Sequence, residues 1–183
     1  MIRTNQRVER VAKSALLTRA LIHMNYRKLS REDFDAIVTG ELTHYALWLE
    51  DELIGIISDY FLGSSEKRRD FTRLLLRRDG LTFQNKIEIV RAMLPLFTNS
   101  EASSDLKKIL TKIENFKVFR NALAHGLDIQ SSTADKMSLR IEVVTRSGKE
   151  KTVEITPASH QRIMNNTENL LEQLQKVRKA LKR

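Results

Sequence analysis

Several residue types that support common enzyme classes are scarce or absent in this sequence. It contains no cysteine, which excludes disulfides, thiolate zinc sites and a cysteine nucleophile. The four histidines are widely spaced and form no His-x3-His pair, so the sequence predicts no metal site. It has neither a P-loop nor a GxGxxG loop, and we expect no cofactor. Aromatic residues make up 6% of the chain, which argues against a base-stacking surface.

Long apolar runs are missing as well. No segment approaches the apolar length of a membrane span, so we expect no membrane contact. The sequence begins Met1-Ile2-Arg3-Thr4 without an apolar signal core, which predicts a cytoplasmic protein. With 183 residues and 41% hydrophobic content, the chain is long and apolar enough to form one domain, 1–183, around a core.

Acidic residues are in the minority. There are 32 Lys and Arg against 23 Asp and Glu, and the resulting net charge of +9 suits a nucleic-acid partner without being diagnostic of one. Two basic clusters occur, and a solvated helix face is the alternative interpretation for both. We favour that interpretation for the C-terminal cluster, Lys176–Arg183. The other cluster contains the candidate nucleic-acid-binding residues, which are Arg68, Arg69, Arg73, Arg77 and Arg78.

Apolar periodicity predicts a mainly helical chain. Helices are expected over residues 6–26, 30–62, 70–78, 82–97 and 103–125, with a long last helix after Thr156-Pro157. We expect Ser30 to cap the second helix and Gly63 to end it. The fifth helix should begin near Ser103 or Ser104 and close at Gly126 in a left-handed conformation.

A different pattern occupies residues 137–155. Apolar and polar residues alternate on both sides of the segment Arg146-Ser147-Gly148-Lys149, which is typical of a β-hairpin with a tight turn. The expected fold is therefore an all-α bundle with one β-hairpin inserted before a long C-terminal helix.

Arg120 stands out in the fifth helix. It projects into the middle of an apolar stripe formed by Leu106, Ile109, Ile113, Phe116 and Leu123. Because arginine is rarely buried without a partner, Arg120 should contact something specific. Three interpretations remain open. Arg120 pairs with a carboxylate among Glu50, Asp51 and Glu52, or it binds an anion in a cleft with His125, or the stripe is a dimer seam.

The residues beside Arg120 suggest a chemistry. Asn121 and His125 are four apart on the helix and share a face, and Arg120 lies on the neighbouring face. Asn121 can hold the imidazole in one tautomer, and the helix dipole favours the imidazolium of His125. An arginine that binds a phosphate and a histidine that transfers a proton suffice for attack of a ribose 2′-hydroxyl on phosphorus. The reaction needs both a base and an acid. A single histidine provides only one of these two proton transfers, which favours two motifs in one site.

The segment Arg120-Asn121-Ala122-Leu123-Ala124-His125-Gly126 resembles the motif of the HEPN superfamily, a group of small helical domains. The segment Gly80–Ile87 also resembles one seen in members of that group. The resemblance implies an HEPN-like helical bundle, metal-independent RNA cleavage and a motif paired across a homodimer. It also allows inactive, partner-binding domains. Nucleotidyltransferase-paired toxins of the family carry a tyrosine two residues after the histidine. This chain has Leu127 there, so we expect no regulation by tyrosine modification.

Two functions therefore compete. In the first, the protein is an endoribonuclease with Arg120, Asn121 and His125 as catalytic residues, and it acts as a toxin that an antitoxin or another regulatory protein binds. In the second, it is a non-catalytic module in which the same residues bind RNA or protein. Both are compatible with a homodimer.

Overall fold

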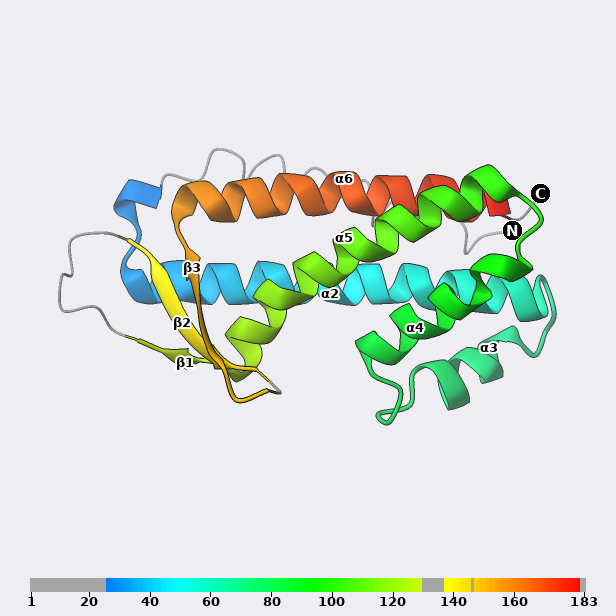
Figure 1. The fold of residues 1–183 in the computed structure, drawn as a ribbon, viewed down its shortest axis with the longest axis horizontal. Coiled ribbons are helices and arrows are strands. Elements are labelled where there is room, and N and C mark those ends of the chain that lie inside the picture. The colour runs from blue at the N-terminus through cyan, green and yellow to red at the C-terminus, as the bar shows by residue number, and fades with distance from the viewer. Residues whose placement is uncertain (1–25, 130–136, 146, 182–183) are drawn as a thin grey trace.

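Three long helices form the body of the protein. The structure is a computed structural model, and it describes residues 26–129, 137–145 and 147–181. The long helices are α2 (Arg31–Leu62), α5 (Ser100–His125) and α6 (Pro157–Leu181). Figure 1 shows α2 and α6 running alongside each other while α5 crosses them diagonally and contacts both. The prediction of a mainly helical fold with a hairpin is confirmed. The predicted helix 6–26 lies outside the described residues except for Tyr26.

Helix α2 agrees with its predicted bounds. The Ser30 hydroxyl accepts a hydrogen bond from the backbone N–H of Asp33 and so caps the first turn. The helix ends at Gly63, whose φ of 52° is one that glycine adopts without strain. Between these ends, apolar side chains at helical spacing enter the core, including Phe34, Val38, Leu42, Leu49 and Leu53.

Helix α5 differs from its prediction at both ends. It begins at Ser100, because Asn99 caps it by accepting a hydrogen bond from the N–H of Ala102. Gly126 follows its last residue with φ −87°, so the predicted left-handed closure is wrong. Glycine is needed here for space instead. A Cβ on Gly126 would lie 2.2 Å from Cγ2 of Ile141, because the chain turns directly into a strand.

That strand belongs to a small antiparallel sheet in the order β1–β2–β3. The strands are β1 (Leu127–Asp128), β2 (Leu139–Val144) and β3 (Glu150–Ile155). β2 and β3 form the predicted hairpin, with Ile141 opposite Val153 and a turn at Gly148, whose φ is 76°. β1 was not predicted, because two residues are too short to show alternation. It pairs Leu127 with Glu142 and fixes the end of α5 to the sheet.

The segment between α2 and α5 is less regular than predicted. In place of one helix over 70–78, it contains α3 (Arg68–Phe71) followed by the π-helical turn η2 (Thr72–Leu76). The next helix, α4 (Phe83–Met93), passes into the 3-10 turn η3 (Leu94–Leu96). Pro95 lacks an N–H and so cannot continue the α-helical pattern. Figure 1 shows α3 and α4 beside the second half of α2.

Arg178 joins α6 to α2. Its Nε lies 2.7 Å from a carboxylate oxygen of Asp59, and a terminal nitrogen lies 2.8 Å from Glu52. The guanidinium rests on Gly55, where any Cβ would approach its carbon to 2.2 Å. Burial lowers the pKa of Arg178, but the hydrogen bonds to Asp59 and Glu52 outweigh it, so the pKa rises above its ordinary value. Within the C-terminal basic cluster, Arg178 therefore differs from the predicted solvated face.

Candidate functional site

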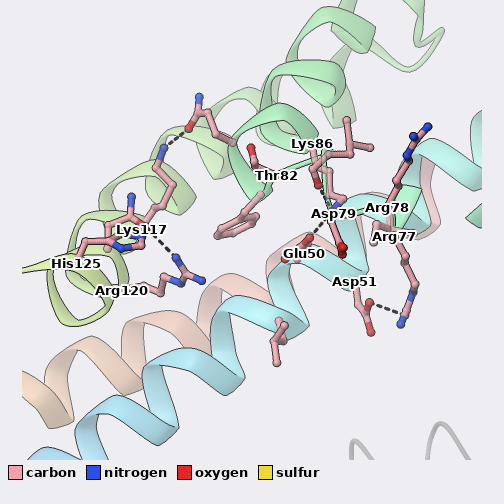
Figure 2. Close-up of a pocket in the computed structure, with 16 residues that line it drawn as sticks. Glu50, Asp51, Arg77, Arg78, Asp79, Thr82, Lys86, Lys117, Arg120 and His125 are labelled. Atoms are coloured by element: carbon pink, nitrogen blue, oxygen red, sulfur yellow. Dashed lines mark hydrogen bonds and ion pairs between the residues drawn. The ribbon is translucent and has the colours of Figure 1, made fainter. Parts of the chain in front are cut away.

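The motif residues line an open pocket of about 820 Å³ between α2, α4 and α5. Arg120, Asn121 and His125 reach it from the last turns of α5, so the structure brings all three together on one wall. Figure 2 shows Arg120 and His125 at one end of the pocket, with Arg77 and Arg78 at the opposite end. A volume of this size lies within the range of small-molecule binding sites.

Arg120 has no ion pair with any carboxylate of the described residues. The three predicted carboxylate partners are all engaged elsewhere: Glu50 with Lys86, Asp51 with Arg77, and Glu52 with Arg178. The interpretation of Arg120 as a structural ion-pair residue is therefore wrong for the part of the chain that the structure describes. Arg120 is half-buried, and its guanidinium donates one hydrogen bond of 3.3 Å to the Asn121 side-chain oxygen. Most of its donors therefore have no partner among the described residues, and Arg120 lines the pocket.

Asn121 and His125 share the pocket wall without a hydrogen bond between them in the described structure. The Asn121 amide oxygen accepts from Arg120 instead. The predicted role of Asn121 in fixing the imidazole tautomer is therefore not seen in this arrangement. His125 is exposed in the last turn of α5, where its ring is accessible to a ligand.

The basic cluster divides into two groups. Arg77 and Arg78 line the pocket, and Arg77 also pairs with Asp51 at 2.7 Å. Arg68 serves the end of α2: it contacts Asp59 at 2.5 Å and donates to the backbone oxygen of Gly63 at 2.9 Å. Arg73 pairs with Asp70 at 3.7 Å on the surface.

Arg69 is exposed and, like Arg68 and Arg73, does not line this pocket. Two of the five predicted nucleic-acid-binding residues are therefore at the site. The other three lie outside it, Arg68 and Arg69 on α3 and Arg73 in the π-helical turn.

Sequence reasoning missed two lysines of the pocket. Lys86 of α4 is 3% exposed, pairs with Glu50, and donates to the backbone oxygen of Leu81 at 2.6 Å. Lys117 of α5 donates to the side-chain oxygen of Gln84 across the pocket wall. Spacing alone could have identified Lys117, because it lies four residues before Asn121 on the same face. The role of Lys86 depends on a contact with α2 that its own helix does not reveal.

The start of α4 forms the wall opposite the motif. Thr82 and Asn85 cap this helix reciprocally, each side chain accepting a hydrogen bond from the other's backbone N–H. This cap fixes the neighbouring Leu81, Phe83 and Gln84, which line the pocket. The two segments that carry the family resemblance, 80–87 and 120–126, therefore meet at one pocket.

The pocket is rich in positive charge. Its lining contains five basic side chains and three carboxylates. Two of the basic side chains are neutralised, because Lys86 pairs with Glu50 and Arg77 pairs with Asp51. The ionised groups that remain without an ion pair among the described residues are Arg78, Lys117, Arg120 and Asp79. A pocket with this surplus favours an anionic ligand.

Comparisons with known proteins supply no relative: no family model, curated protein or solved structure matches this chain. Among the residues that the structure describes, no group of three or more His, Asp and Glu side chains is placed to hold a metal ion. None of the described helices combines the length and apolar character that crossing a membrane requires.

Proposed function

We propose that this protein is a metal-independent endoribonuclease of the HEPN type. One observation carries the proposal: Arg120 and His125 open into the same cationic pocket, and no carboxylate of the described residues neutralises Arg120. Arginine binds the non-bridging oxygens of a phosphate through its planar set of donors. Arg120 would hold the phosphate that is attacked, with Arg78 at the far end of the pocket binding a more distant part of the strand.

The reaction follows from these groups. His125 as neutral imidazole accepts the proton of the ribose 2′-hydroxyl, and the oxygen forms a bond to the adjacent phosphorus. The bond to the 5′-oxygen of the next nucleotide breaks, and that oxygen leaves with a proton. Arg120 stabilises the additional negative charge on the phosphoryl oxygens in the transition state. The products are a 2′,3′-cyclic phosphate and a 5′-hydroxyl.

A homodimer supplies the second proton transfer in this proposal. The described lining of the pocket contains one histidine, whereas the reaction needs both a base and an acid. Apolar side chains beside the motif support an interface there: Leu47 lines the pocket and is 54% exposed, and Leu127 is 75% exposed. Two pockets joined at this surface would place two copies of His125 near one RNA strand. A protein partner such as an antitoxin would act by covering the same surface.

One observation favours the alternative function, a non-catalytic module that binds RNA or protein. Asn121 contacts Arg120 and leaves the His125 ring without an orienting hydrogen bond among the described residues. A binding site needs the cations but does not need a fixed imidazole tautomer.

A cleavage assay separates the two functions. Purified protein is incubated with RNA in the presence of chelator, alongside His125→Ala and with DNA of the same sequence. The proposal predicts that the wild type cuts RNA and leaves DNA intact, because DNA lacks the attacking hydroxyl. It predicts that His125→Ala binds RNA with little change but does not cut it. Binding without cleavage by the wild type would favour the module, and an absolute requirement for a divalent ion would contradict the mechanism.

A further inference from the structure

We infer that Lys117 binds a second phosphate of the RNA strand, next to the one that Arg120 holds. The inference rests on the proposed function, since it assigns a further contact to the same pocket. Residues 117, 121 and 125 lie four apart on α5, so one stripe of the helix presents Lys117, Asn121 and His125 to the pocket. The side-chain conformation of Lys117 is fixed by a contact within the protein, because its ammonium group donates a hydrogen bond to the side-chain oxygen of Gln84 of α4.

The partner of Lys117 is what distinguishes it from the other lysine of the pocket. Lys86 is buried and forms an ion pair with Glu50, so its charge is already neutralised by a carboxylate of the protein itself. Gln84 offers Lys117 a neutral amide oxygen, which satisfies one of its three donors and none of its charge. Gln84 also donates its own amide N–H to Glu88, which orients that oxygen toward Lys117. The result is a positioned cation in the wall of an open pocket.

The place of Lys117 along α5 shows which phosphate it would contact. Eight residues separate it from His125, which corresponds to about 12 Å along the helix axis, whereas Arg120 is about 7.5 Å from His125. The order along the wall is therefore His125, Arg120, Lys117. A phosphate that reacts beside His125 is within reach of Arg120, and Lys117 is better placed for the neighbouring phosphate on the side of α4.

The same helix provides a matched control. Lys112 of α5 also donates to a glutamine oxygen, that of Gln173 at 3.1 Å, but it lies at a different cavity, between α5 and α6. Lys112→Met and Lys117→Met therefore remove the same charge and the same kind of hydrogen bond from one helix. Only Lys117→Met removes a cation from the proposed site.

The test is the salt dependence of binding to a single-stranded 2′-O-methyl RNA, which cannot be cleaved by 2′-hydroxyl attack. Loss of one phosphate contact should reduce the slope of log K against log salt by about 0.7 and weaken binding roughly fivefold at 0.1 M salt. We expect both changes in Lys117→Met, neither in Lys112→Met, and recovery of the slope in Lys117→Arg.

Equal slopes in Lys117→Met and the wild type would overturn the assignment, even if the melting temperature of the variant falls, because a purely structural lysine changes stability alone. Failure of the wild type to bind the RNA would overturn both this assignment and the proposed function. Normal binding with the predicted slopes, but no cleavage of unmodified RNA, would contradict only the nuclease reaction.

Discussion

At the scale of single residues, the contacts of Arg120 distinguish a structural ion-pair residue from a residue of the candidate site. A buried arginine that neutralises a carboxylate is costly to remove, because its partner is left charged in the interior. Here each predicted carboxylate has another cation, and the one side-chain hydrogen bond of Arg120 within the described part of the chain goes to the amide oxygen of Asn121. Arg120 therefore lines the pocket and neutralises none of these three carboxylates.

Arg120→Ala is accordingly predicted to fold normally and to lose RNA binding. We expect its free energy of unfolding to stay within about 1 kcal/mol of the wild type, since no buried charge is left unpaired. Urea denaturation measures the first effect, and titration with RNA measures the second. A loss of about 3–5 kcal/mol would instead indicate a structural ion pair and would remove Arg120 from the site.

At the scale of helices and strands, sequence patterns predicted the elements whose signals are local. Ser30 and Gly63 mark the ends of α2, and alternation marks the β2–β3 hairpin. Features set by contacts between elements were missed, among them β1, the π-helical turn and the reason for Gly126. The same division holds in the pocket. Arg120 and His125 were found from α5 alone, whereas Lys86 depends on Glu50 of α2.

Two glycines of α2 test how Arg178 holds α6 against this helix. Gly55→Ala would place a methyl group 2.2 Å from the Arg178 guanidinium and displace it from Asp59 and Glu52. We expect a loss of about 1–3 kcal/mol in thermal or urea unfolding. Gly40→Ala is the control, because nothing lies within 4 Å of its Cβ position, and it should stabilise the helix by about 0.5–1 kcal/mol. Equal effects at the two positions would show that Arg178 moves aside without cost.

At the scale of the whole molecule, the proposed reaction depends on assembly. In the proposal, the one histidine of the described pocket supplies one proton-transfer group, and Leu47 of the pocket and Leu127, two residues after His125, are exposed. We therefore predict a dimer at micromolar concentration, measurable by light scattering. Leu47→Glu and Leu127→Glu should shift it toward monomer and reduce cleavage, because a charge in an apolar interface is costly. A wild type that is strictly monomeric and still cuts RNA would contradict the composite site.

The central claim is that the 2′-hydroxyl of the substrate is the attacking group in the pocket of Arg120 and His125. The most direct test is an RNA with a single 2′-O-methyl group at a linkage that the wild-type protein cuts. The account predicts that cleavage stops at that linkage alone, continues at unmodified linkages, and leaves 2′,3′-cyclic phosphate ends there. Cleavage at the methylated linkage would contradict it, because the attacking oxygen would then have to come from elsewhere.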